Sequence, residues 1–223
     1  MNQKLLDNDP DYHKITSSEL ISFKTYLPKI QNSFSIIKKH FIGKIKTYIY
    51  AVNNREIRSL PVTIQNRHFM HLCGVKYTKG ASGFVKDLKN NRLNLNELYL
   101  KEDGSTFQKL EVIDKINLLD TLETTVSIGN NMARIHYDNL LRTKANILGI
   151  VVDTDDNGIN FPLSLLNISA TDLHTLTRFK VFAILEENKS THVKRCLLKD
   201  KSCTKKLNEY IDQLLNVPKK GDC

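Results

Sequence analysis

Residues 67–74, Arg-His-Phe-Met-His-Leu-Cys-Gly, place two histidines and a cysteine beside an apolar wall of Phe69, Met70 and Leu72. An imidazole titrates near neutral pH, so His71 can give or take a proton where lysine and aspartate normally cannot. A histidine among apolar neighbours is more often a hydrogen-bonded residue of the core or of a sheet edge. His71 is therefore a candidate for proton transfer, with a structural role as the alternative.

Length and composition predict one compact unit that folds by itself. The chain has 223 residues, of which 40% are hydrophobic and 26% are charged, and this composition is too apolar for a disordered chain. No apolar run approaches the roughly 20 residues that span a bilayer, and residues 1–10 lack the apolar core of a signal peptide. The four cysteines include no Cys-x-x-Cys pair, so we expect reduced thiols in a cytoplasmic protein without a membrane partner.

The formal net charge of +9 is unevenly distributed along the chain. Eight basic side chains against one acidic lie between Lys24 and Arg58, and seven against one lie between Lys189 and Lys206, whereas residues 97–123 are mainly acidic. An excess of lysine and arginine attracts phosphate backbones or anionic membranes. We expect the two basic segments to meet in space and to form one face for nucleic acid. Lysine-rich faces that only keep a protein soluble would have the same pattern.

Hydrophobic periodicity predicts a helix near the N-terminus and an alternating strand after it. Residues 17–40 carry apolar side chains at helical spacing, and Pro28 is expected to kink or split this helix. Residues 44–52 alternate between apolar and polar side chains, as in a strand. Lys44, Lys46 and Tyr48 lie on one face of this strand and are suited to RNA contact. A half-exposed amphipathic strand without a ligand would have the same pattern.

The rest of the chain predicts an α+β fold. We expect an antiparallel sheet of about four or more strands packed with helices, a helical insertion in the middle and a C-terminal helix. Helices are predicted at 84–90, 93–100, 106–122 and 203–217, and further strands at 60–65, 124–128, 133–137, 146–153, 178–186 and 191–198. The chain divides into an N-terminal helical segment (1–43), a main domain (44–200) with a helical insertion (81–122), and a C-terminal helix with a tail (201–223).

Residues 75–83, Val-Lys-Tyr-Thr-Lys-Gly-Ala-Ser-Gly, are basic and bounded by glycines, which is typical of a mobile loop that carries function. The glycines lack the Gly-Lys-Ser/Thr ending of a nucleotide-binding P-loop, so nucleotide binding by this route is disfavoured. Lys76, Tyr77 and Lys79 are the side chains of this stretch that suit contacts to phosphate or RNA.

Two short patterns contain metal-binding side chains, and both are incomplete. Residues 153–158, Asp-Thr-Asp-Asp-Asn-Gly, match the first half of a calcium loop, but its twelfth position is Ser164 and not glutamate. The Asn-Gly pair favours a β-turn there. His68, His71 and Cys73 offer zinc-binding atoms without a fourth ligand beside them. We expect no metal ion and no cofactor.

A second histidine lies in the predicted strand at 133–137. Alternation puts Arg134 and His136 on the same face of this strand, which adds one cation and one titratable ring to the candidates. Two solvated residues of an edge strand would have the same spacing.

Three segments, taken in order, resemble a known family. Phe69-x-His71-Leu72-x-Gly74, the basic stretch and helices after it, and residues 153–166 with Pro162-x-Ser164-Leu-Leu resemble the phage-associated branch of the barnase-EndoU-colicin-RelE (BECR) nucleases. The resemblance covers residues 44–200. It implies a helix packed on a four-stranded antiparallel sheet, and an RNase that works without metal. The implied chemistry is attack of a ribose 2'-OH on the adjacent phosphate.

Such a reaction needs a proton acceptor, a proton donor and positive charge at the phosphate. The resemblance implies that His71 acts as acid or base and that Ser164 donates a hydrogen bond to a phosphate oxygen. Lys76, Arg134 and His136 join them on chemical type. No acidic residue of the kind that barnase-like enzymes use as base lies beside His71, so the division between acid and base stays open. The candidate RNA contacts are Lys44, Lys46, Tyr77, Lys79, Lys194 and Arg195.

RNA is the expected partner, and an inhibitor or a host protein is a further one. The alternative is a non-catalytic nucleic-acid-binding or host-interaction protein of a phage or mobile element. A purely structural protein is a third hypothesis, and it predicts no salt-dependent affinity for RNA.

Overall fold

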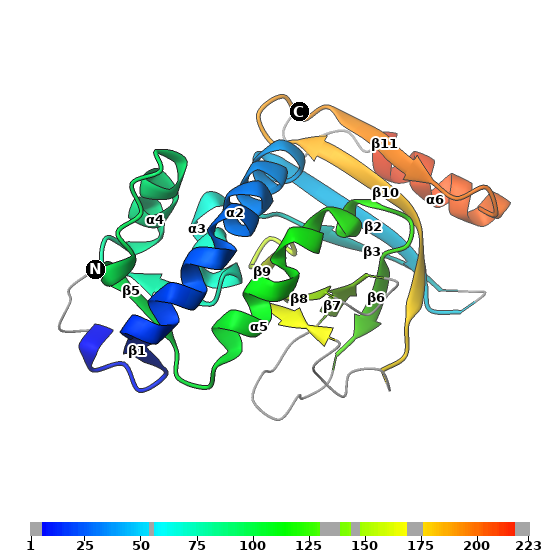
Figure 1. Cartoon of the computed structure of the whole chain (residues 1–223). Helices are drawn as coiled ribbons and strands as arrows, with labels where there is room; N and C mark the ends of the chain where they lie inside the picture. Colours follow the sequence, from blue (N-terminus) through cyan, green and yellow to red (C-terminus); the bar gives the residue numbers. More distant parts are fainter. Residues whose placement is uncertain (1–5, 54–55, 130–138, 144–147, 169–175, 217–223) are drawn as a thin grey trace.

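One large β-sheet curls round until its ends meet (Figure 1). The structure is a computed structural model that describes residues 6–53, 56–129, 139–143, 148–168 and 176–216. Among these residues the order of the strands is β11 (Lys194–Lys199), β10 (Phe179–Asn188), β2 (Lys44–Ala51), β3 (Ile57–Val62), β9 (Asn160–Asn167), β8 (Leu148–Thr154), β7 (Asn139–Arg142) and β6 (Thr125–Ile128). Strand β10 pairs with both β2 and β6, which closes seven strands into a barrel and leaves β11 outside.

The predicted α+β class and the mainly antiparallel sheet are confirmed, with two differences. The pair β3–β9 is parallel, through Val62 and Asn160. The closure of the sheet through β6 and β10 was not expected, because it joins strands about 50 residues apart in the sequence, which no local pattern specifies.

Helix α2 (Ser17–His40) lies along the barrel and begins at Thr16 (Figure 1). The Glu19 N–H donates to Thr16 Oγ1 over 3.3 Å, and the Thr16 N–H donates to Glu19 Oε2 over 2.9 Å, so the two residues form a capping box. The helix continues through Pro28, and the predicted split does not occur. Its buried residues are Phe23, Ile30, Ser33, Phe34 and Ile37.

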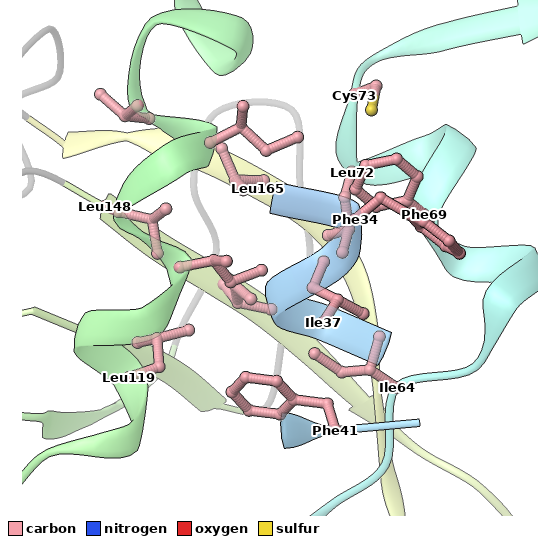
Figure 2. Close-up of a cluster of buried hydrophobic side chains, with 14 of the residues drawn as sticks. Phe34, Ile37, Phe41, Ile64, Phe69, Leu72, Cys73, Leu119, Leu148 and Leu165 are labelled. Carbon is pink, nitrogen blue, oxygen red and sulfur yellow. The ribbon is translucent and has the colours of Figure 1, made fainter. Parts of the chain in front are cut away.

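The apolar side chains of residues 67–74 pack against α2. They belong to helix α3 (Asn66–Leu72), and Figure 2 shows Phe34 of α2 beside Phe69 and Leu72 of α3. The ring centroids of Phe34 and Phe69 are 5.0 Å apart. This aromatic contact within the core fixes the position of α3 relative to α2.

A second, small sheet changes two predictions. It has the order β1 (Tyr12–Lys14), β5 (Leu98–Lys101) and β4 (Val75–Tyr77). The expected loop at 75–83 is therefore β4 followed by the first turn of helix α4 (Gly80–Lys89), and the expected helix at 93–100 ends as a strand. Strand β5 is buried between two partners, and this pairing overrides the helix propensity of its leucines.

The expected helix at 106–122 is divided in the structure. Helix α5 (Ser105–Val112) is followed by the 3-10 segment η2 (Ile113–Asp120), which packs on α2. At the C-terminal end, helix α6 (Lys205–Asn216) confirms the predicted closing helix and buries Leu207 and Ile211 against Ile49, Ala183 and Leu185 of the barrel. Among the described residues, no helix has the length and apolar character needed to cross a membrane.

The face of β2 that was predicted to contact RNA is inside the protein at Lys46 and Tyr48, so the expectation was wrong for these two residues, whereas Lys44 is half-buried. Lys46 is 1% exposed, and Tyr48 is fully buried. The ammonium of Lys46 lies 2.8 Å from Asp120 and 2.9 Å from Glu186, because the closed barrel and η2 cover this face.

The two basic segments do meet, but they meet around a carboxylate. Glu186 accepts from Lys46 and also lies 3.2 Å from the ammonium of Lys44 and 2.6 Å from the guanidinium of Arg195. Burial acts to raise the pKa of Glu186, but hydrogen bonds from Lys46, Arg195 and Lys44 outweigh it and lower the pKa to about 2. These cations therefore stabilise the junction of β2, β10 and β11.

We expect Glu186→Gln to destabilise the fold, because it leaves the buried ammonium of Lys46 with less compensating charge. Breaking a buried ion pair costs about 3–5 kcal/mol, and chemical denaturation at pH 7 measures this loss. The native pKa of Glu186 lies below its usual 4.5, so its contribution is present above pH 4.5 and is lost as the pH falls toward about 2.

Glu56→Gln is the matched control, because it removes a carboxylate from an exposed pair with Arg58. Such pairs contribute about 0–1 kcal/mol. Equal, small losses in both glutamine variants would show that the buried carboxylate does not hold the basic segments together.

Candidate active site

Helix α3 presents His71 on the side opposite its core residues. Phe69, Met70 and Leu72 are at most 3% exposed, whereas His71 is exposed. His68, three residues earlier, is 8% exposed. Of the two histidines in this stretch, His68 is thus the buried one and His71 is the one that a substrate can reach.

The end of α3 approaches α5 through a turn at Gly74, which has a φ of +70°. The hydroxyl of Thr106 donates to the Gly74 carbonyl over 2.6 Å and accepts from the Lys101 N–H over 2.9 Å. A Cβ at Gly74 would lie 2.8 Å from Cδ of Lys109 and 3.2 Å from Cα of Thr106. Glycine is therefore required here, and this contact holds α3, β5 and α5 together.

Three lysines lie close enough to His71 to act on its charge, and we call Lys76, Lys101 and Lys109 the lysine cluster. They come from β4, β5 and α5. Partial burial of the ring, followed by the charges of Lys76, Lys109 and Lys101, lowers the pKa of His71 below its usual 6.5. His71 is therefore mainly neutral at pH 7, which is the form that accepts a proton.

Lys109 is the most unusual member of the cluster. It is 8% exposed, and within the described residues its ammonium makes no hydrogen bond or ion pair. Burial, and then the charge of Lys101, lowers the pKa of Lys109 to about 8. A lysine with this pKa can release a proton near neutral pH, unlike an exposed lysine.

Sequence reasoning missed Lys109 because its helix was assigned to packing. A signal was present, since Lys109 lies three residues after Thr106 and four before Ile113, both of which are fully buried. This spacing puts the lysine on the buried face of the segment. What the sequence did not show is the pocket into which the side chain opens.

Lys109 and Ser164 line the same pocket of about 630 Å³, which we call the basic pocket. Ser164, on β9, is 9% exposed and donates to the carbonyl of Leu165 over 3.4 Å. Lys101 also lines this pocket. The structure thus brings together Ser164, which was predicted, and two lysines that were not.

Lys76 is covered by the segment that precedes α2. Its ammonium donates to the carboxylate of Asp9 and lies 4.2 Å from the centre of the Tyr12 ring. The ammonium of Lys101 lies 4.3 Å from the centre of the same ring and 3.9 Å from the carboxylate of Asp11. The charge that was predicted for Lys76 is present, but in this structure a carboxylate neutralises it.

Within the described residues, His71 lines not the basic pocket but a second pocket of about 470 Å³, which we call the apolar pocket. Its apolar wall is Phe161-Pro162-Leu163, the three residues of β9 that precede Ser164. His68 lies in the same wall, and burial, followed by the charges of Arg67, His71 and Lys189, lowers the pKa of His68 to about 4. Strand β9 therefore contributes residues to both pockets. The polar lining of the apolar pocket is Thr63, Gln65, Arg67 and Asp155.

Other predicted contacts are engaged elsewhere. Tyr77 is fully buried, and its hydroxyl and the ammonium of Lys79 both bind one oxygen of Asp87, each over 2.9 Å. Lys194 donates to the carbonyl of Leu214 over 3.2 Å. In the described part of the chain, no hydrogen bond or ion pair joins these groups, or Lys44, Lys46 and Arg195, to His71 or to the lysine cluster.

Two predicted residues and one predicted metal pattern remain. Arg134 and His136 lie outside the described residues. Cys73 is fully buried among core residues (Figure 2), whereas His71 is exposed, and the described residues contain no group of side chains suited to a metal ion. The segment with Asn157-Gly158 is a turn between β8 and β9, with Gly158 at a φ of +74°, as predicted.

A family model of nucleases matches residues 29–200, which is most of the chain. The family is described as phage-Barnase-EndoU-ColicinE5/D-RelE like nuclease4. The matched range includes α3, the lysine cluster and Ser164. No curated protein and no solved structure matched the chain significantly. The protein therefore belongs to this phage-associated family of BECR-type nucleases, as its sequence motifs predicted.

Proposed function

We propose that the protein is an RNase that cleaves by attack of a ribose 2'-OH on the adjacent phosphate, without a metal ion. The proposal is carried by exposed His71, whose pKa is lowered by burial and by the charges of three lysines, in a chain of a nuclease family. RNA is accordingly the proposed partner, and the cytoplasm is the proposed compartment.

His71 is the proposed general base. Its pKa lies below 6.5, so at pH 7 the ring has a free nitrogen that can take the proton of the 2'-OH. The resulting O2' then forms a bond to phosphorus. A neutral histidine can fill this role without the carboxylate that barnase-like enzymes use.

Lys109 is the proposed general acid. At pH 7 its ammonium is still mainly protonated, because its pKa is about 8. It gives a proton to the 5'-oxygen as the bond from phosphorus to that oxygen breaks, which leaves a 2',3'-cyclic phosphate and a 5'-hydroxyl. Solvent then returns the proton from His71 to Lys109, and both residues regain their starting forms.

Lys101 and Ser164 line the same pocket as Lys109 and suit the binding of the phosphate. The ammonium of Lys101 offers positive charge, and the Ser164 hydroxyl offers a hydrogen bond to a non-bridging oxygen. Lys76 adds charge when Asp9 releases it. Fixed ammonium groups can thus stabilise the transition state, so the proposed reaction needs no divalent ion.

The first test is cleavage of a DNA oligonucleotide that contains one ribose, in EDTA. We expect cleavage only on the 3' side of that ribose, with a 2',3'-cyclic phosphate at the new end. His71→Asn removes the proton acceptor and is expected to lower the rate by about 10²–10⁴-fold.

His192→Asn is the matched control, because His192 is exposed on the turn between β10 and β11 and pairs with Glu187. It is expected to keep the wild-type rate. Cleavage that survives His71→Asn, or that also occurs in all-DNA, would contradict the proposed chemistry. Bound but intact RNA would support the non-catalytic alternative.

The pH profile provides a second test. The reaction needs neutral His71 and protonated Lys109, so kcat/KM should rise through a pKa below 6.5 and fall above a pKa of about 8. Lys109→Met keeps the packing of the aliphatic stem but removes the proton donor. We expect it to abolish the alkaline limb and to lower the rate at least about 100-fold.

Lys115→Met removes an equal charge from the exposed 3-10 segment and is expected to leave the profile unchanged. An alkaline limb that persists in Lys109→Met would show that another group donates the proton.

A further inference from the structure

We propose that the apolar pocket binds the nucleobase of the nucleotide next to the cleaved phosphate. This inference rests on the proposed RNase function and adds a recognition site to it. The pocket is about 470 Å³, within the range of about 300–1,000 Å³ that is usual for small-ligand sites. His71 lines it, so a base held there would lie beside the reacting 2'-OH.

The walls of the pocket suit an unstacked base. The rings of Phe161 and His68 have centroids 6.0 Å apart and planes tilted by 31°, and together they form an aromatic surface. Leu163, which lines the same pocket, is 39% exposed, although an apolar side chain of this size is usually covered. Single-stranded RNA is recognised by stacking its bases on surfaces of this kind.

The polar groups of the pocket suit the edge of a base. The His68 ring is held by two donors, because the Gln65 N–H donates to Nδ1 over 3.1 Å and the Arg67 guanidinium donates to Nε2 over 3.4 Å. The Gln65 amide, the Asp155 carboxylate and the Arg67 guanidinium add acceptors and donors around the opening. Such a mixture of donors and acceptors discriminates between bases by their hydrogen-bonding edges.

The order of residues along β9 connects the two pockets. Phe161, Pro162 and Leu163 line the apolar pocket, and Ser164, the next residue, lines the basic pocket. One strand thus contributes to the walls of both pockets, which places the proposed base site and the proposed phosphate site on the same structural element.

The test compares single-ribose oligonucleotides that have either a base or an abasic site at the ribose and at the next position. In the wild-type protein, removal of the recognised base is expected to lower kcat/KM by about 10-fold or more, since stacking contributes about 1–3 kcal/mol per base. In the Leu163→Ala and Phe161→Leu variants, removal of the same base should lower kcat/KM by a much smaller factor. Ile21→Ala, at an exposed position of α2, is the matched control and should keep the full effect.

Three outcomes separate this inference from the proposed function. A smaller abasic effect in the two pocket variants, with the control unchanged, supports the base site. Equal abasic effects in all proteins overturn the base site but leave the RNase function intact. No cleavage of any ribose-containing oligonucleotide overturns both.

A separate observation concerns residues 6–14, which we call the N-terminal strap and which lie outside the family match. We infer that the strap masks the lysine cluster and competes with RNA phosphate. Asp9 binds Lys76, Asp11 lies 3.9 Å from Lys101, and Tyr12 lies between these two ammonium groups. The strap also forms part of the wall of the basic pocket, through Pro10 and Asp11.

The strap is anchored on both sides of these contacts. Leu6 is fully buried, and β1 pairs with β5. The His13 ring binds Glu19 over 2.9 Å and Glu102 over 2.6 Å. The carboxylates are thus held where a phosphate would bind, because the strap is ordered independently of them.

The double variant Asp9→Asn, Asp11→Asn keeps the shape of the strap and removes its negative charge. We expect its KM for a single-ribose oligonucleotide to fall about 3- to 10-fold at low salt, as two partly exposed ion pairs are lost. A second measurement uses the same changes in the His71→Asn background, where the dissociation constant should fall by a similar factor.

Glu209→Gln with Asp212→Asn changes the net charge equally on exposed α6 and is the matched control. Equal affinity gains in both double variants, or a loss in the strap variant, would show that the strap only positions the lysines.

Discussion

The contact between Gly74 and Thr106 is the constraint on which the candidate site depends. One buried hydroxyl binds the carbonyl at the end of α3 and the backbone N–H of Lys101, and the absence of a Cβ at Gly74 admits the stem of Lys109. His71 comes from a helix that the core holds through Phe69. Because catalytic groups must be held in place before the substrate arrives, the proposed roles of His71 and Lys109, which come from distant segments, depend on this packing.

Several lysines of the protein are already paired with carboxylates, so their positive charge is not available to RNA. Lys46 is buried beside two carboxylates, where it stabilises the barrel. Lys76 is neutralised by Asp9, and Lys101 lies close to Asp11. Lys109, whose spacing in the sequence indicates only that it is buried, opens into a pocket without a hydrogen-bonding partner in the described chain. Net charge alone therefore does not identify the residues that would bind RNA.

Periodic segments could be predicted from the sequence, and segments defined by long-range pairing could not. Helix α2, strand β2 and helix α6 follow local patterns of apolar spacing and were predicted closely. Strand β5 is short and exists because β1 and β4 pair with it, and the barrel closes through strands far apart in the chain. The candidate site likewise has one residue that the sequence indicated and one that depends on long-range packing. His71 was found from its chemical type, whereas the burial that changes Lys109 depends on a turn elsewhere in the chain.

An NMR titration of the His71 ring tests most directly whether this histidine and the lysine cluster share one site. We predict a pKa below 6.5 in the wild-type protein and a higher pKa in Lys109→Met, because a neighbouring positive charge has been removed. Lys115→Met should leave the His71 pKa unchanged. A His71 pKa at or above 6.5 that does not respond to Lys109→Met would contradict the shared site and, with it, the proposed division of acid and base.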